Sequence, residues 1–417
     1  MIDVKRLREE PEYRRGIERK RVRPGLIDEL LAAEEIRRGL LSEVEELRAE
    51  QNVASKEIGR AAPDERAERI AAAAVLKERL TDREPSLSVA EASVRALALQ
   101  IPNPASPEVP DGGEDDGVVL RTVGGTPGPP PLDHAALGES LGFVDSDRGA
   151  EASGSRFAYL MGEAVLLELA LVQWVMSQLA ADGFTPVIPP VLVREQTMEE
   201  AGFFPTDRSQ VYALPEDELF LVGTSEVPLS ALHRGDLFDA DALPLRYGGY
   251  STCFRREAGT YGKDTRGIFR VHQFDKVEMF VWAHPDRSNE EHERILAIEE
   301  KIVGGLGLPY RVVDIAAGDL GAPAARKFDI EVWLPSEGRY RELTSCSNYL
   351  DYSARRLGAR VKDESGNRLV HTLNGTACAV GRTLLFLFEH FQESDGGLAI
   401  PDVLVPYTGF SKVGPRS

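Results

Sequence analysis

Two heptad patterns occupy the first hundred residues. Over Leu26–Ile58, apolar or small side chains recur in alternating steps of four and three, with Arg37 and Gln51 as polar interruptions. A second seam runs over Ala73–Ile101. A heptad seam indicates a helix that packs on another helix, so the two seams predict an antiparallel helical hairpin with helices roughly 50 Å long. Pro85 inside the second helix predicts a kink or a break there.

A change in composition follows this hairpin. Residues 103–134 are dense in proline, glycine and acidic side chains, which is typical of a linker, with one short strand expected at Val118–Val123. An apolar helix is then expected at about 162–182, followed by a strand at 183–193 that contains prolines. The pattern predicts an N-terminal domain over 1–102 with an arm at about 26–101, a linker over 103–134 and a second domain over 135–417.

Composition and charge narrow the class of protein. The chain has 417 residues, 42% of them hydrophobic, and a net charge of -19, so a nucleic-acid ligand would have to meet a local basic surface. No apolar run long enough for a membrane span and no signal peptide is evident. The three cysteines, Cys253, Cys346 and Cys378, lack metal-ligand spacing, which favours a reducing compartment and no zinc site.

The segment from Cys253 to Val281 carries the candidate chemistry. It predicts an antiparallel hairpin whose two strands flank a charged, glycine-bearing loop at Glu257–Gly267. Alternation along the second strand, expected at Ile268–Val281, places Arg270, Phe274, Lys276 and Glu278 on one face. The other face carries Phe269, Val271, Val277, Met279 and Val281 toward a core. An arginine, a flat ring and a carboxylate on one face suit a nucleotide beside a small polar molecule.

The residues FRREAG and DTRGIFRVHQFDKVE of this hairpin resemble motif 2 of class II aminoacyl-tRNA synthetases, in the form seen in seryl-tRNA synthetases. Further matches occur in the expected order over nearly the whole chain. The resemblance implies an α+β fold in which an antiparallel sheet flanked by helices follows a long antiparallel coiled-coil arm. It also implies a homodimeric cytoplasmic ligase that uses ATP and Mg²⁺, joins L-serine to tRNA(Ser), and serves tRNA(Sec) where that tRNA is present.

The resemblance assigns the residues that hold serine. They are Thr224, Ser225 and Glu226 at the α-amino group, Arg255 at the carboxylate, and Glu278 and Thr376 at the hydroxyl. Glutamate pairs with an ammonium and threonine adds a hydrogen bond. Taken as a bare tripeptide, Thr224-Ser225-Glu226 is more typical of a helix cap, and its place before motif 2 reverses that reading.

The resemblance also assigns the ATP contacts. They are Arg255, Arg256, Glu257, Arg270, Val271, Phe274, Glu342, Leu343, Thr344, Ser345 and Arg382. Glu342 and Ser345 are the implied Mg²⁺ ligands, since oxygen donors suit a hard cation. Arg255, Arg382 and Glu342 are the implied catalytic residues. Without the resemblance, residues 341–348 read as an edge strand, and Arg382 at a helix start reads as a surface residue.

The arm has two interpretations. An isolated heptad hairpin is more typical of an oligomerisation coiled coil, whereas in the seryl-tRNA synthetases such an arm reaches tRNA. Candidate phosphate contacts near its tip are Arg48, Lys56, Arg60, Arg66, Arg69, Lys77 and Arg79. Each of these side chains is also compatible with a solvated helix face paired with nearby glutamates.

Three functions remain open from the sequence. The first is serine–tRNA ligation, and the second is a duplicated or serine-activating paralogue that serves antibiotic biosynthesis or resistance. The third is a non-catalytic coiled-coil protein that binds RNA. The presence of Arg255, Glu278, Glu342 and Arg382 counts against the third, because a protein without catalysis has no need of that set.

Overall fold

The structure is a computed structural model that describes residues 1–259 and 267–415. Within them the chain forms two compact units, Met1–Pro102 and Asn103–Ser417. Residues 260–266, which belong to the loop expected at Glu257–Gly267, lie outside the described residues.

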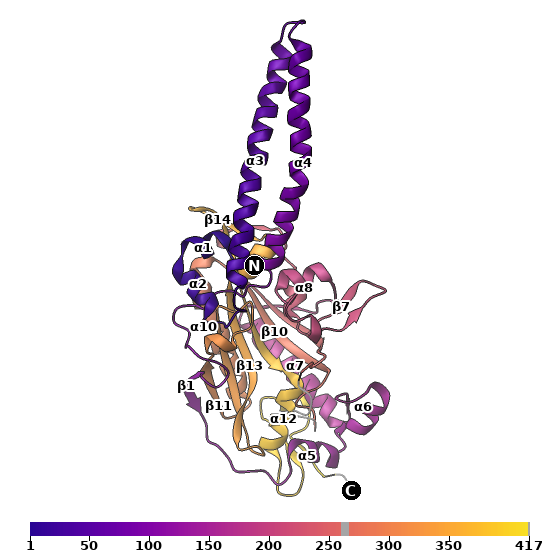
Figure 1. Ribbon diagram of the computed structural model, residues 1–417. Coiled ribbons are helices and arrows are strands. Elements are labelled where there is room, and N and C mark those ends of the chain that lie inside the picture. Colours follow the sequence, from indigo (N-terminus) through magenta and orange to yellow (C-terminus); the bar gives the residue numbers. More distant parts are fainter. Residues whose placement is uncertain (260–266, 416–417) are drawn as a thin grey trace. The chain divides into compact units, whose positions relative to one another are not determined.

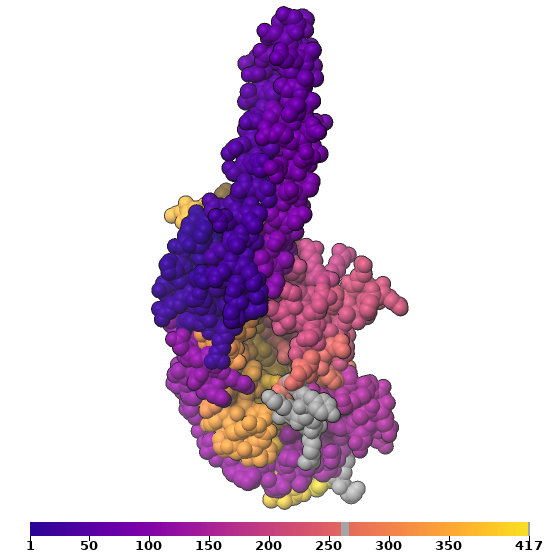
Figure 2. All heavy atoms as spheres, viewed as in Figure 1, coloured from indigo at the N-terminus to yellow at the C-terminus, as the bar shows by residue number. Residues whose placement is uncertain are grey.

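The first unit contains the helical arm. Its helices are α1 (Val4–Glu9), α2 (Pro11–Glu18), α3 (Leu26–Arg60) and α4 (Arg66–Ala98). The long helices α3 and α4 form the expected antiparallel hairpin (Figure 1). In the space-filling view, side chains fill the space between them along the visible face (Figure 2).

The heptad seams account for the packing of the arm. Leu30, Val44 and Leu47 of α3 and Leu87 of α4 are buried, as the seams predict. The polar interruption at Arg37 is compensated locally, because its Nε donates to Glu34 Oε2 over 2.7 Å. Such a pair within one helix turn lets a charge occupy a seam position at little cost.

Pro85 does not break α4, which excludes one of the two outcomes expected from the sequence, a kink or a break. The helix runs without interruption over Arg66–Ala98. Pro85 and Thr81, the residue whose carbonyl loses its usual donor, are both exposed, so water can solvate that carbonyl. The packing of the seam on either side of Pro85 holds the helix together.

The second unit is built on an eight-stranded sheet. In spatial order its strands are β1 (Val118–Val123), β11 (Tyr310–Asp314), β12 (Arg326–Leu334), β13 (Arg339–Leu350), β16 (His371–Ala379), β10 (Gln273–Ala283), β9 (Leu245–Phe254) and β4 (Thr185–Val187). Neighbouring strands are antiparallel except for β4 and β9, which are parallel. β13 is therefore an interior strand and not the edge strand that its sequence alone suggested.

Helices cover one face of this sheet. They include α5 (His134–Ser140), α7 (Glu163–Ala181), α10 (Ser288–Gly305) and α12 (Val380–Phe391). The largest apolar core contains residues of all four helices together with Val277, Met279 and Val281 of β10, as the alternation predicts. On the opposite face of β10, Phe280 and Trp282 pack in a second, smaller apolar core, and Lys276 and Glu278 line the cavity described below.

Shorter elements complete the second unit. They are α6 (Ser146–Ser153), α8 (Glu195–Ala201), α9 (Glu226–Ser230), α11 (Tyr352–Leu357), α13 (Val405–Thr408), β2 (Val144–Asp145), β3 (Tyr159–Leu160), β5 (Leu192–Arg194), β6 (Ala213–Leu214), β7 (Leu219–Leu221), β8 (Leu237–Asp239), β14 (Arg360–Asp363), β15 (Gly366–Leu369), β17 (Leu398–Ala399) and β18 (Lys412–Val413), with 3₁₀ turns at Arg208–Gln210, Ala240–Ala242, Pro285–Arg287 and Ala317–Asp319.

Two strand predictions are wrong in detail. The single strand expected at 183–193 is two short strands, β4 and β5, in different sheets, because Pro189 and Pro190 have no N–H to donate to a ladder. The strand expected at Ile268–Val281 begins only at Gln273, and residues 267–272 form turns and bends. Alternation of faces therefore does not apply before Gln273.

Helix α7 is a core helix of this unit. By length and composition it is the one helix of the described chain that is apolar enough to cross a membrane. Leu167, Leu171 and Val175 are buried in the main core, whereas Leu166 and Leu169 are about half exposed. The helix thus packs on the sheet with one side and leaves an apolar stripe on the other.

A buried carboxylate ties the C-terminal half of α12 to two distant segments. Glu389 Oε1 accepts from the His134 backbone N–H over 3.1 Å and lies 2.9 Å from His134 Nδ1. The Ser336 backbone N–H donates to Oε2 over 2.9 Å, and the Ser336 hydroxyl donates to Oε1 over 2.7 Å. Burial would raise the pKa of Glu389, but the donors of His134 and Ser336 outweigh it and hold the pKa below its ordinary value.

Glu389→Ala is expected to lower the free energy of unfolding by about 3 kcal/mol, because buried donors lose their acceptor. Since the folded-state pKa of Glu389 is depressed, its contribution is present above the ordinary glutamate pKa and is lost as pH falls through the folded-state value. Thermal unfolding of both proteins at neutral pH measures the difference, and the difference should shrink as the pH is lowered below the ordinary glutamate pKa. Glu364→Gln, in an exposed turn, is the control. An equal effect of both substitutions would contradict this role for Glu389.

Candidate functional site

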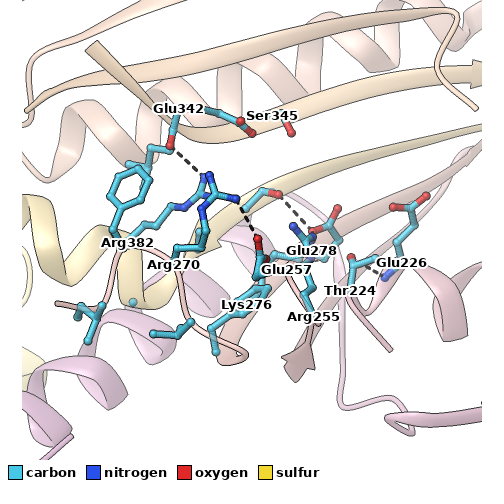
Figure 3. A pocket seen from close by; sticks show the side chains of 18 of the residues that line it. Thr224, Glu226, Arg255, Glu257, Arg270, Lys276, Glu278, Glu342, Ser345 and Arg382 are labelled. Atoms are coloured by element: carbon cyan, nitrogen blue, oxygen red, sulfur yellow. Dashed lines mark hydrogen bonds and ion pairs between the residues drawn. The ribbon is translucent and has the colours of Figure 1, made fainter. Parts of the chain in front are cut away.

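A cavity of about 190 Å³ opens on the polar face of the sheet in the second unit. Its walls come from the turn between β7 and α9, from residues 268–271, and from β10, β13, β16 and the start of α12. In Figure 3, Thr224 and Glu226 lie at one end, and Arg382 and Glu342 lie at the other. Segments separated by more than 150 residues thus meet in one pocket.

One end of the cavity gathers two carboxylates and their partners. Glu226 and Glu278 are both buried. The side-chain amide of Asn374 donates to Glu226 Oε2 over 3.1 Å and to Glu278 Oε1 over 3.2 Å. The hydroxyl of Thr376 donates to Glu278 Oε2 over 3.3 Å, and Lys276 forms an ion pair with the same oxygen. Glu278 is therefore held in one position by three side chains.

Glu226 has fewer hydrogen-bond partners than Glu278. Its Oε1 is buried and has no hydrogen-bond partner among the described residues. Burial raises the pKa of Glu226 to about 8, and the nearby Glu278 carboxylate adds to that rise, while Lys276, the Tyr349 hydroxyl and Arg255 oppose it. A cationic ligand beside Glu226 would remove this cost, so the carboxylate suits an incoming ammonium.

The arginines of the cavity divide into two kinds. Arg270 forms an ion pair with Glu257 at 2.9 Å. Arg255 donates from Nε to the Gly223 carbonyl over 3.1 Å, and Arg382 donates from Nη1 to the Glu342 carbonyl over 3.2 Å. Desolvation by neighbouring protein atoms lowers the pKa of Arg382, which is partly buried. Arg255 and Arg382 have no carboxylate partner among the described residues, so both are suited to bind an anion such as a triphosphate.

Aromatic rings and small apolar side chains lie between these charges. The Arg255 guanidinium lies 5.3 Å from the centre of the Phe274 ring, and Arg382 lies 5.0 Å from that of Phe269. Val271 also lines the cavity. This arrangement offers a flat base a surface for stacking next to cations for its phosphates.

Glu342 and Ser345 lie on the same side of β13 although they are three residues apart. In a regular strand such residues face opposite ways. Here Ile330 pairs with Thr344 and Glu331 with Glu342, so β13 has a bulge at Leu343. The bulge brings both side chains into the cavity wall.

The carboxylate of Glu342 has the properties of a ligand for a hard cation. Glu342 is exposed at the cavity wall, although neighbouring protein atoms partly desolvate its carboxylate, which by itself would raise its pKa. The positive charges of Lys327, Arg382 and Arg255 outweigh this effect and hold the pKa below its ordinary value. Within the described residues no group of three or more histidine, cysteine, aspartate or glutamate side chains is placed to hold a metal. Two protein oxygens fit Mg²⁺, which keeps several waters and is completed by substrate phosphates.

Most of the predicted site residues line this cavity, namely Thr224, Glu226, Arg255, Glu257, Arg270, Val271, Phe274, Glu278, Glu342, Leu343, Ser345, Thr376 and Arg382. Three do not. Ser225 is buried and donates to the Gly249 carbonyl, Thr344 donates to Glu299 Oε2, and the Arg256 guanidinium lies over Tyr212, 5.8 Å from the ring centre.

The sequence reading missed several residues of the wall, namely Phe203, Ile268, Phe269, Asn374, Ala379 and Gly381, and it gave no role to Lys276. Alternation had placed Phe269 and Val271 on the core face. Phe269 does belong to the main core but also lines the cavity, and Val271, within the turns and bends at 267–272, lines the cavity and is not among the core residues. Asn374 and Lys276 were detectable, because each lies two residues from an assigned side chain on the same strand face.

Comparisons with known proteins agree with this geometry. The seryl-tRNA synthetase N-terminal domain model matches residues 1–105, and the class II core domain model for the synthetases of G, H, P, S and T matches residues 211–391. Serine--tRNA ligase 1 of Streptomyces avermitilis is 49% identical, over 98% of each chain.

Two solved structures extend the likeness to the fold. Seryl-tRNA synthetase from Pyrococcus horikoshii complexed with ATP gives a TM-score of 0.93 at 38% identity, over 100% of both chains. Cytoplasmic serine-tRNA ligase from Naegleria fowleri in complex with AMP gives 0.89 at 31% identity, over 100% of this chain and 99% of that one. The helical arm, the antiparallel sheet and these full-length matches together show that the chain belongs to the seryl-tRNA synthetase family of class II aminoacyl-tRNA synthetases.

Proposed function

We propose that this protein is a serine–tRNA ligase, which forms seryl-adenylate from L-serine and ATP and then transfers the seryl group to the 3′ end of tRNA(Ser). Where tRNA(Sec) is present, it is a second acceptor. The observation that carries the proposal is the cavity itself, which places a pocket for an ammonium and a hydroxyl beside unpaired arginines and a stacking surface. The N-terminal domain match over residues 1–105 disfavours a serine-activating ligase that does not use tRNA.

Serine fits the end of the cavity formed by Glu226 and Glu278. In the proposed complex its ammonium pairs with Glu226 and bonds to Thr224, both of which are buried. Its hydroxyl meets Glu278 and Thr376, which already lie within 3.3 Å of each other. Arg255, which also lines the cavity, holds the carboxylate.

ATP fits the other end. Phe274 and Val271 meet the base, Glu257 lies toward the adenine amino group, and Arg255 and Arg382 bind the phosphates. Arg256 points toward Tyr212, outside the cavity wall, so its proposed contact with the nucleotide requires the side chain to turn. Mg²⁺ held by Glu342 and Ser345 would neutralise phosphate charge.

The first step needs little proton transfer. A carboxylate oxygen of serine attacks the α-phosphorus in line, and the bond from that phosphorus to the oxygen of the leaving pyrophosphate breaks. Because the carboxylate is already ionised, the protein contributes position and charge through Arg255 and Arg382. In the second step the 3′-hydroxyl of the terminal adenosine attacks the seryl carbonyl carbon. AMP then leaves with the bonding electron pair, and the hydroxyl proton is released.

The first unit fits the tRNA. We assign tRNA binding to residues 1–102, with the arm at about 26–101, catalysis to 135–417, and the connection between them to 103–134. Of the seven basic candidates near the tip, Arg48 pairs with Glu84 and Arg69 pairs with Glu57 and Glu65. Exposed pairs of this kind are weak, so they yield readily to phosphates.

We also propose a homodimer that works in the cytoplasm. The exposed apolar side chains of α7 and of the segment after β4, Leu166, Leu169 and Ile188, suit contact with a second copy. All three cysteines are free and buried, which is compatible with a reducing compartment.

Serine-dependent exchange of pyrophosphate into ATP, followed by charging of tRNA(Ser) with the same preparation, tests the function. Arg255→Ala and Arg382→Ala should each lower kcat/KM for exchange by about 10²–10³-fold, the scale for a fixed group that stabilises developing charge. Arg339→Ala, which removes an exposed arginine paired with Glu337, should have little effect. Wild-type rates in both site variants would refute this assignment.

Removal of residues 28–99 should leave serine-dependent exchange largely intact and abolish tRNA charging. The reason is that the cavity is lined wholly by the second unit, which has its own core. Exchange and charging are measured side by side, with circular dichroism as the control for folding. Undiminished charging by the shortened protein would show that the arm does not bind the tRNA.

Glu278→Gln should reduce the preference for serine over alanine more than it weakens ATP binding. Alanine leaves the buried Glu278 and Thr376 without a ligand hydroxyl, and sites of this kind reject such analogues by about 10⁴–10⁵-fold. Threonine keeps the hydroxyl and is excluded only by space, so the wild type should discriminate less strongly against it. The kcat/KM values for the three amino acids decide the matter, with Glu364→Gln as the control. An unchanged serine-to-alanine ratio would mean that the hydroxyl is read elsewhere.

A further inference from the structure

A lysine lies in the part of the cavity where serine is proposed to bind, although serine needs no cation at its hydroxyl. Lys276 is 6% exposed, and it belongs to the same strand face as Glu278, two residues away on β10. Its ammonium forms an ion pair with Glu278 Oε2. A buried lysine is rare unless it is paired, and here the partner is the carboxylate assigned to the substrate hydroxyl.

The surroundings of Glu278 show how this pair is held. Asn374 donates to Oε1 over 3.2 Å, and Thr376 donates to the oxygen that also meets Lys276, over 3.3 Å. Both residues lie on β16, which pairs with β10 through a register shift at Glu278. The carboxylate cannot turn away from Lys276 without losing these bonds.

The two carboxylates at this end of the cavity differ in whether they have a cationic partner. Two carboxylates, Glu226 and Glu278, are close enough that Glu278 raises the pKa of Glu226, whereas Lys276 lowers it. Arg255 and Tyr349 also face Glu226, and Asn374 bonds to it. The ion pair of Lys276 with Glu278 leaves Glu226 as the one carboxylate at this end to meet a cation.

We propose that Lys276 is a specificity-determining residue, which makes the pocket accept a β-hydroxyl and reject a β-ammonium by cancelling the charge of Glu278. The inference rests on the proposed function. It deepens that function by defining the substrate class as α-amino acids with one ammonium and a small neutral hydrogen-bonding group on the β-carbon.

L-2,3-Diaminopropionate is the critical compound, because it is serine with an amino group in place of the hydroxyl. With Lys276 present, a β-ammonium would lose its hydration beside a pair of zero net charge and close to a like charge, which is costly. With Lys276 neutralised, the same ammonium would meet an uncompensated carboxylate. Discrimination then depends on a repulsive group as much as on an attractive one.

Pyrophosphate exchange with serine and with L-2,3-diaminopropionate at pH 6.5 tests the proposal, with competition against serine used where exchange is slow. Lys276→Met should shift the ratio of the two kcat/KM values, or of the two inhibition constants, toward diaminopropionate by about tenfold to a hundredfold. Lys276→Arg should retain the wild-type ratio, because it retains the charge. An unchanged ratio in a folded Lys276→Met protein overturns the proposal.

Lys301→Met is the matched control. Lys301 also pairs with a carboxylate, Asp182, at 2.9 Å, but this pair lies on the surface of the unit. The control should leave the ratio unchanged, so a shift as large as that of Lys276→Met would also overturn the proposal.

The wild-type protein offers a second test that does not depend on the folding of a variant. L-Alanine lacks the hydroxyl but brings no second ammonium, so the wild type should bind it more tightly than protonated diaminopropionate. The inhibition constants of the two compounds against serine, measured at pH 6.5, give the comparison. Diaminopropionate that binds as tightly as alanine, or more tightly, overturns the proposal.

The two proposals fail in different ways. If the wild type shows no serine-dependent exchange, the proposed function is wrong. If exchange with serine is normal and the preference over diaminopropionate does not respond to substitution of Lys276, only the role of Lys276 is wrong.

Discussion

A charge inside a protein is tolerated when it meets an opposite charge or several donors, and this constraint organises the cavity of the second unit. Four cationic and four anionic side chains line it. Arg270 pairs with Glu257 and Lys276 pairs with Glu278, so four of the eight charges neutralise each other in ion pairs. Arg255, Arg382, Glu226 and Glu342 have no ion-pair partner among the described residues. In the proposed complex a triphosphate would meet Arg255 and Arg382, an ammonium would meet Glu226, and a divalent cation would meet Glu342.

The sheet makes this arrangement possible. Three adjacent interior strands, β13, β16 and β10, carry half of the polar side chains that line the cavity, and helices α7, α10 and α12 cover their other face. Two register shifts act on the site. One places Glu342 and Ser345 on the same side of β13, and the other sets Glu278 opposite Thr376. Bulges of this kind redirect side chains without interrupting the strand, so the chemistry changes while the core below remains packed.

Much of the fold and most of the site followed from the sequence where the physical signal was local. The heptad seams predicted α3 and α4, because a helix that packs on another helix must repeat its apolar contacts every 3.5 residues. Alternation predicted the core face of β10 from Val277 onward, because successive side chains of a strand point to opposite faces of the sheet. Two other local signals misled. Pro85 argued against a continuous helix, yet α4 continues through it because its surroundings are solvated. Alternation placed Val271 on the core face, and it lines the cavity because residues 267–272 are not a strand.

The sequence by itself determined the family and the presence of a helical arm and an antiparallel sheet. It also assigned sixteen site residues, of which thirteen line the cavity, because motifs record which side chains the chemistry needs. Only the tertiary structure decided how those residues share their charges. Contacts between strands and helices direct the Ser225 and Thr344 hydroxyls to protein acceptors outside the cavity. Such contacts also let Asn374 bridge two carboxylates and pair Lys276 with Glu278. Such contacts follow from strand register and burial. The spacing of residues within one segment does not predict either of them, because each strand acquires its partners only when distant segments fold against it.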